Sequence, residues 1–265
     1  MSKNILCISI LFILSGTLSA QYKTEMKKLY SKNVKDSFEI YVSQPKDFSK
    51  EKSYDVVYYC DANLKSGKKL RELISNGDKL SKNKNIVFVG IGHIGNFHVL
   101  RRRDFITPFI KNGDTTASSE YYGHIQEFYF FLIKELIPSA ESKFKSSGKR
   151  TIIGHSLGGL FVFYCLFQND TYFQNYIALS PALWINNYNI YQFNKIRDTM
   201  KAKSYLYFSA GSLEVLNYIL AGANQMNSFL SEKKIKNLDY EYQVQKSKDH
   251  NSAVPVALEH VLQKL

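Results

Sequence analysis

A serine framed by glycines stands between two apolar stretches near the middle of the chain. Residues 154–158 read Gly-His-Ser-Leu-Gly, after the apolar run 151–153 and before the apolar stretch 158–167. Between a strand and a buried helix this pattern is typical of a nucleophile elbow, a sharp turn that lifts the serine hydroxyl clear of the backbone. The pattern predicts Ser156 as a nucleophile for acyl chemistry, with the Leu157 amide donating to the substrate oxyanion. The alternative is a glycine-rich turn that carries an idle serine.

A serine hydroxyl is a weak nucleophile, so a base and an acid that orients the base must accompany it. Where such an elbow supplies the nucleophile, these partners follow in the order acid, then histidine. Glu214 follows the apolar run 205–209, and His250 follows the run 240–244. If both runs are strands of a parallel sheet, both residues lie at its carboxyl edge, where ligands bind. We expect His250 to take the proton from Ser156 and Glu214 to orient the imidazole.

Other histidines and carboxylates compete for these two roles. His155 adjoins the serine, but its side chain should point away from the elbow, so it is interpreted as structural. His93 follows an apolar run and is placed to line the site. Asp239 begins its strand at the opposite edge of the sheet. Asp249 is adjacent to His250, so the two side chains are poorly placed to face one another.

A second oxyanion donor is expected in the loop after the apolar run 54–60. That loop begins Asp61-Ala62-Asn63, and the amide of either Ala62 or Asn63 is suited to the role. An ordinary strand-ending turn is the competing interpretation. The residues alone leave the choice between the two amides open.

The elements that must position these groups are visible as apolar runs that alternate with helical patterns. This alternation predicts an α/β fold with a mostly parallel central sheet and helices on both of its faces. Because no linker, repeat or change of composition interrupts the pattern, we expect a single domain over residues 21–265. The predicted strands are 38–42, 54–60, 86–92, 151–153, 176–179, 205–209 and 240–244, and the predicted helices are 68–80, 125–136, 158–167, 216–230 and 254–265.

The segment 93–119 lacks clear periodicity and is punctuated by glycine, asparagine, threonine and proline. A connection of this length inside a compact domain is usually a lid or a binding loop. It holds Arg101, Arg102 and Arg103, a compact basic triplet. This triplet suits an anionic small substrate as well as a phosphate backbone.

Composition narrows the class of protein. The chain has 265 residues, of which 45% are hydrophobic and 22% charged, and this ordinary globular composition excludes a disordered or collagen-like chain. The net charge is +12, but the lysines are scattered and form no nucleic-acid-binding motif, so we expect no nucleic-acid partner. After residue 20 the cysteines are Cys60 and Cys165, too few for a disulfide scaffold or a zinc site. We therefore predict two buried free thiols and no metal site.

Residues 1–20 have the pattern of a secretory signal peptide. Lys3 is positive, residues 5–14 are apolar, and small residues lead to Ala20. This pattern predicts cleavage between Ala20 and Gln21 and a secreted or periplasmic protein. The apolar run is too short to span a bilayer comfortably, so we expect no stable membrane insertion. An apolar first helix of a cytosolic domain is the alternative.

Taken together, these segments resemble the esterase family that includes esterase D, the enterobactin-type siderophore esterases, the feruloyl and acetyl-xylan esterases and the mycolyltransferases. The resemblance extends over nearly the whole chain after residue 20. It is carried by the segments YYCDAN (58–63), RDFITP (103–108), FLIKELIP (131–138), TIIGHSLGGL (151–160), SPALW (180–184), GSLE (211–214) and DHNS (249–252).

The resemblance implies an α/β-hydrolase fold of about eight strands, no cofactor, and hydrolysis of acyl esters through Ser156, Glu214 and His250. It also favours Asn63 as the second oxyanion donor, because the family's Asp-Gly-X turn is matched here by Asp-Ala-Asn. Ala62 departs from the glycine that is usual in that turn.

For the substrate, the resemblance favours the siderophore esterases, because of the segment 103–108, the basic triplet and the compact length. An extra residue, Ile106, leaves open whether Arg101, Arg102 or Arg103 matches the family's arginine. We expect the triplet, His93 and Trp184 to contact a small-molecule ester, with the arginines attracting catecholate or other anionic groups. The alternatives are an esterase for feruloyl or acetyl groups on a glycan, an acyltransferase, and a non-catalytic ligand-binding protein on the same fold.

Overall fold

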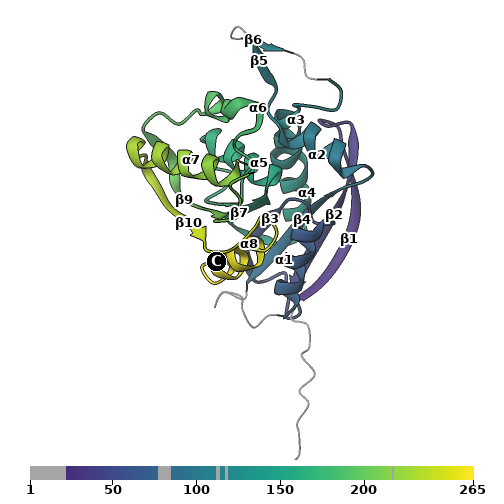
Figure 1. Cartoon of the computed structure of the whole chain (residues 1–265). Coiled ribbons are helices and arrows are strands. Elements are labelled where there is room, and N and C mark those ends of the chain that lie inside the picture. Colours follow the sequence, from purple (N-terminus) through teal and green to yellow (C-terminus); the bar gives the residue numbers. More distant parts are fainter. Residues whose placement is uncertain (1–21, 77–84, 112–113, 117–118, 217) are drawn as a thin grey trace, which may run out of the picture.

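The computed structural model describes residues 22–76, 85–111, 114–116, 119–216 and 218–265 (Figure 1). The predicted signal peptide and the last residues of the predicted helix 68–80 lie outside the described residues. Among the described helices, none combines the length and the apolar character that a membrane span requires.

An eight-stranded sheet forms the centre of the described structure, in the order β1-β2-β4-β3-β7-β8-β9-β10. The strands from β4 to β10 in this order run parallel, whereas β1 pairs antiparallel with β2, and β2 antiparallel with β4. This confirms the predicted α/β fold with a mostly parallel sheet. The strands are β1 (Tyr22–Ser31), β2 (Asp36–Pro45), β3 (Ser53–Tyr59), β4 (Ile86–His93), β7 (Lys145–His155), β8 (Asn175–Leu179), β9 (Thr199–Gly211) and β10 (Lys236–Gln245).

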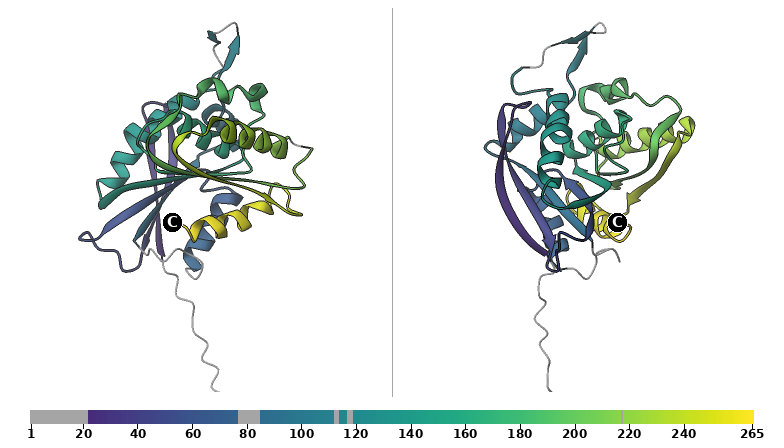
Figure 2. Two further views of the ribbon diagram at one scale, coloured as in Figure 1. Left: turned by 90° about the vertical axis from the view of Figure 1, so that its left-hand side faces the viewer. Right: turned by 180° about the vertical axis from the view of Figure 1, so that it is seen from behind.

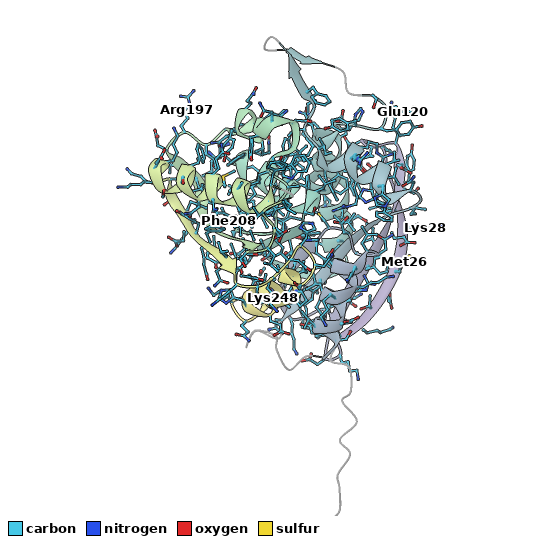
Figure 3. The ribbon with its side chains drawn as sticks, in the orientation of Figure 1. Met26, Lys28, Glu120, Arg197, Phe208 and Lys248 are labelled. Atoms are coloured by element: carbon cyan, nitrogen blue, oxygen red, sulfur yellow. The ribbon has the colours of Figure 1, made fainter. Side chains whose placement is uncertain are left out.

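How deeply a strand is buried explains whether it could be predicted from the sequence. Every residue of β4 is buried, as expected for a strand covered on both faces, and its sequence is a continuous apolar run. β1 is an edge strand whose residues are mostly exposed and include four charged side chains. Its sequence therefore carries no apolar run, and we did not predict it. Figure 3 shows the contrast: Met26 and Lys28 lie on β1 at the surface, whereas Phe208 of β9 is fully buried.

Two apolar layers cover the sheet, one on each face (Figure 2, left). One layer centres on α5 (Leu157–Phe167), in which all residues from 158 to 167 are buried. The opposite layer is formed by α1 (Lys65–Asn76) and α8 (Ala253–Leu262), which contribute Leu70, Leu73, Leu258 and Val261 to the second core. The remaining long helix, α7 (Ile219–Lys233), packs on the α5 side.

The predicted helix 125–136 is longer and less regular than expected. α3 (Ile125–Phe130) continues through a π-helical turn, η1 (Phe131–Leu136), into α4 (Ile137–Glu141). Pro138 lacks an amide hydrogen and its ring clashes with the carbonyl four residues earlier. A widened turn directly before the proline accommodates this clash, so the helix passes Pro138 and does not end there.

The segment 93–119, for which the sequence predicted no regular element, contains a helix and a hairpin. It contains α2 (Phe97–Phe105), whose N-cap Asn96 accepts a hydrogen bond from the His98 amide at 3.1 Å. Three consecutive arginines interrupt the apolar periodicity of this helix, which is why its sequence did not suggest it. After α2, β5 (Phe109–Lys111) and β6 (Asp114–Thr116) form a hairpin that stands out from the rest of the chain (Figure 1). The short elements α6 (Ile185–Tyr188) and η2 (Asn189–Phe193) follow β8.

Candidate active site

Ser156 occupies the turn between β7 and α5. Its backbone has φ 60° and ψ −117°, a region that residues with a side chain rarely adopt. A Cβ on Gly154 would lie 2.1 Å from the Gly158 carbonyl oxygen, so the two ends of the turn meet only because residue 154 is glycine. The Ser156 amide donates to the Leu179 carbonyl at 2.9 Å, which fixes the turn against β8. This is the geometry of a nucleophile elbow.

Glu214 and His250 form a hydrogen-bonded pair. Nδ1 of His250 lies 2.5 Å from Oε1 of Glu214. The second carboxylate oxygen of Glu214 accepts hydrogen bonds from Ser180 Oγ at 2.7 Å and from the Gly211 amide at 2.5 Å. Burial would raise the pKa of Glu214, but the hydrogen bonds from His250, Gly211 and Ser180 outweigh burial and lower that pKa below its usual value. Because a carboxylate only accepts, Nδ1 of His250 carries the proton and Nε2 is left to act as a base.

The loops that carry this pair are bound to each other through their backbones. The Ser212 amide donates to the Gln245 carbonyl at 2.9 Å, and the Leu213 amide donates to the Lys248 carbonyl at 3.0 Å. A Cβ on Gly211 would lie 2.2 Å from the Lys248 carbonyl oxygen. The loops therefore approach this closely only because residue 211 is glycine.

A cavity of about 700 Å³ lies at this edge of the sheet. Ser156, which follows β7, and His250, which follows β10, both line it. Two residues far apart in the sequence therefore lie on the wall of one cavity. The wall contributed by α1 is basic and includes Lys65 and Lys68, whereas Lys69 pairs with Glu72 at 3.2 Å. This arrangement suits an attack by Ser156 on a polar, negatively charged substrate.

The two candidate amides for the second oxyanion donor differ in their partners. The Ala62 amide donates to the Ile91 carbonyl at 2.9 Å and is thereby occupied. The Asn63 side-chain amide donates to the His93 carbonyl at 2.7 Å, which anchors the turn. Of the two, the Asn63 backbone amide is the remaining candidate, together with the Leu157 amide at the first position of α5.

The structure brings one arginine of the basic triplet to the cavity. Arg101 donates from Nε and Nη2 to the two carboxylate oxygens of Asp61, at 2.8 and 2.9 Å, and lines the cavity. Arg103 instead pairs with Asp104 and Asp36, and Arg102 is exposed and outside the cavity wall. Successive residues of a helix point about 100° apart, so α2 separates the three side chains that we expected to act together.

His93 and Trp184 also lie outside the wall of this cavity. His93 is buried, its Nε2 lies 2.9 Å from Asp104 Oδ2, and its ring packs against Phe105 and Phe128. It belongs to the core of the fold, contrary to our expectation of a substrate contact. Trp184 is 38% exposed and its ring contacts Tyr218, with 6.1 Å between the centroids.

One residue at the site was missed in the sequence, and the side-chain direction of another was predicted wrongly. Ser180 is a partner of Glu214, and the signal that was available is its place directly after β8, at the same sheet edge as the other groups. His155 does not point away from the site. Its Nε2 lies 3.0 Å from the His250 carbonyl oxygen, and its ring faces the His250 ring at 4.4 Å.

Cys60 and Cys165 are free and buried, and burial raises the pKa of each thiol. The described part of the chain contains no cluster of three or more histidine, cysteine or acidic side chains arranged to hold a metal ion.

Comparison with known proteins gives consistent matches. The family model described as "Putative esterase" matches residues 31–258. Ferri-bacillibactin esterase BesA of Bacillus subtilis (strain 168) is 33% identical over 172 residues, which is 62% of this chain and 60% of the relative. The chain thus spans about 60% of the length of that curated relative.

Solved structures extend the likeness to the whole fold. The BES protein from Bacillus cereus has a TM-score of 0.73 and 25% identity, over 99% of this chain and 98% of that one. An IroE-like serine hydrolase from Shewanella oneidensis has a TM-score of 0.76 and 21% identity, over 92% of this chain and 79% of that one, and this match concerns the fold alone.

Proposed function

This chain belongs to the esterase family whose model it matches, and from that premise we propose that it is a serine hydrolase of carboxylic esters that acts through an acyl-enzyme on Ser156. The observation that carries the proposal is the Glu214–His250 hydrogen bond, with His250 and Ser156 lining one cavity. The lowered pKa of Glu214 keeps its carboxylate charged at neutral pH, where it orients His250 and stabilises the imidazolium that forms during catalysis.

The reaction proceeds in two halves. His250 takes the hydroxyl proton of Ser156 as the serine oxygen attacks the ester carbonyl carbon, and the oxyanion is stabilised by the Leu157 and Asn63 amides. The carbon–oxygen bond to the alcohol breaks, and His250 returns the proton to the leaving alkoxide. Water then gives a proton to His250 and attacks the acyl carbon. The bond from that carbon to Ser156 Oγ breaks, His250 returns the proton to Oγ, and the carboxylic acid is released.

We propose a siderophore-type ester as the substrate class. The curated relative is a ferri-bacillibactin esterase, and the cavity beside Ser156 has a basic wall. Lys65 and Lys68 are exposed on α1 and line the cavity, whereas the charge of Arg101 is paired with Asp61. Cations in such positions attract the anionic groups of a catecholate ligand.

The serine mechanism is tested with the purified chain and a short-chain nitrophenyl ester. We expect Ser156→Ala to abolish nitrophenol release, by at least about 10³-fold, because it removes the attacking oxygen. Ser66→Ala is the matched control, since Ser66 also lines the cavity but has no role in the mechanism. Circular dichroism verifies that both variants are folded. Turnover by the Ser156→Ala protein at the wild-type rate would exclude the mechanism, and a wild-type chain without turnover that binds a ligand would be a binding protein.

The substrate class is tested by comparing two esters under the same conditions. We expect a ferric catecholate trilactone to be hydrolysed with a kcat/KM at least tenfold above that of a feruloylated oligosaccharide. The reverse order would assign the chain to glycan esters.

We further propose that the chain is exported and that residues 1–20 are removed. The support is the sequence pattern, in which Lys3 precedes the apolar residues 5–14 and small residues lead to Ala20. When the full chain is expressed in a bacterial host, N-terminal sequencing of the exported protein should give Gln21 as its first residue. Retention of Met1 in a cytosolic protein would contradict the proposal.

A further inference from the structure

His155 connects the nucleophile elbow to the segment that carries the base. It is adjacent to Ser156, yet its side chain reaches across to His250, 95 positions later in the sequence. Nε2 of His155 lies 3.0 Å from the His250 carbonyl oxygen. A carbonyl oxygen only accepts, so Nε2 is the donor and this tautomer of His155 is fixed. The two rings also face each other, with 4.4 Å between centroids and 37° between planes.

The donor remains present at neutral pH without adding a charge. Burial, and then the nearby positive charges of His250 and Arg101, lower the pKa of His155 to about 3. The ring is therefore neutral in the physiological range, and it can lie against His250 without repelling the imidazolium that forms there. Arg101 Nη2 lies 3.3 Å from the His155 carbonyl oxygen and restrains the backbone of the same residue.

The segment from β10 to α8 is held at several points along its length. From the loop that carries Glu214, the Leu213 amide donates to the Lys248 carbonyl at 3.0 Å. At the start of α8, Asp249 accepts from the Ser252 amide at 2.8 Å. His155 supplies the hydrogen bond to His250 itself, from the direction of the nucleophile.

We propose that His155 is a positioning residue for the base. It binds the backbone of His250 to the elbow, and so it sets the separation between the Ser156 hydroxyl and the His250 imidazole. This inference rests on the proposed serine mechanism, in which the hydroxyl proton passes to His250.

A pair of variants of similar length isolates the hydrogen bond. In His155→Gln the amide nitrogen lies the same number of bonds from Cα as Nε2 of histidine, so the donor is retained. In His155→Met a methyl group takes that position and the donor is lost. We expect His155→Met to lower kcat on the nitrophenyl ester by about 10- to 100-fold with KM within twofold, and His155→Gln to stay within about threefold of wild type. Equal kcat values for the two variants, or a loss confined to KM, would overturn the proposal.

A spectroscopic signature separates positioning from general destabilisation. The short Glu214–His250 hydrogen bond should give a downfield proton resonance from Nδ1–H of His250. We expect this resonance to broaden or shift in His155→Met and to be restored in His155→Gln. An unchanged resonance in folded His155→Met would count against the proposal. If His155→Met does not fold, His155→Asn replaces it, because asparagine is too short to reach the carbonyl.

The Ser156→Ala protein distinguishes the two proposals. If Ser156→Ala is inactive and His155→Met is as active as wild type, the serine mechanism stands and the role of His155 is refuted. If Ser156→Ala is active, the proposed mechanism itself has failed and the role of His155 fails with it.

Discussion

The lowered pKa of His155 makes the free energy of unfolding depend on pH. In the unfolded chain a histidine takes up its proton near pH 6.5, whereas the pKa of His155 in the folded protein is about 3. Between these values the unfolded state binds the proton and the folded state does not. The stability that His155 contributes is therefore complete above pH 6.5, and it is lost progressively as the pH falls below that value.

This difference predicts how one substitution changes acid sensitivity. Glutamine does not titrate, so between about pH 6.5 and about pH 5 the wild-type protein should lose about 1–2 kcal/mol more unfolding free energy than His155→Gln. Urea unfolding at several pH values measures the difference, and the carboxylates contribute equally to both proteins. Parallel curves for the two proteins would show that His155 titrates normally in the folded state.

At the scale of single residues, local patterns and the predicted ends of strands were enough to identify the main candidate residues of the site. Ser156 lies in a pattern confined to a few neighbouring positions, and Glu214 and His250 each follow a recognisable strand. The direction of the His155 side chain could not be predicted from a local pattern. It depends on a tertiary contact, namely where the segment after β10 passes the elbow. Nothing within a few residues of His155 encodes that crossing.

At the scale of the elements, the site depends on how closely two loops approach. Gly211→Ala would place a Cβ 2.2 Å from the Lys248 carbonyl oxygen and would push the loop with Glu214 away from the loop with His250. We expect kcat to fall by about 100-fold or more, because the acid no longer orients the base. Activity on the nitrophenyl ester, with circular dichroism to verify folding, measures the effect.

Gly222→Ala is the matched control for this substitution. Gly222 lies within α7, and a Cβ there would meet neighbours at 3.4–3.8 Å, which is ordinary contact. We expect unchanged activity and a gain of about 0.5–1 kcal/mol in unfolding free energy, because alanine is favoured over glycine inside a helix. If both alanine variants retained activity, the close approach at Gly211 would not matter for catalysis.

The predictability of the elements follows from their burial. Buried strands and helices such as β4 and α5 carry nearly continuous apolar runs, and we predicted them within a few residues of their bounds. The exposed edge strand β1 and the arginine-rich helix α2 carry no such pattern, since they gain their stability from pairing with β2 and from side-chain ion pairs. Both elements depend on tertiary contacts, which a local sequence pattern does not show.

At the scale of the whole molecule, we expect the net charge of +12 and the basic cavity wall to attract the proposed anionic substrate before it binds. We expect kcat/KM for an anionic catecholate ester to fall severalfold between about 20 mM and about 500 mM salt, because the added ions screen this attraction. A neutral nitrophenyl ester is the control and should change little. Lys68→Gln should weaken the salt dependence for the anionic ester. Equal salt dependence for the two esters would exclude electrostatic attraction as a source of selectivity.

The conformation of Ser156 has an evolutionary consequence. A serine at φ 60° and ψ −117° destabilises the fold by about 1–3 kcal/mol, and glycine at the same place would remove that strain. Selection for folding alone would therefore replace this serine with glycine. A descendant that no longer needed the nucleophile would gain unfolding free energy from that replacement. If the proposed mechanism holds, the strained backbone at Ser156 is kept because reactivity has outweighed thermal robustness in this lineage.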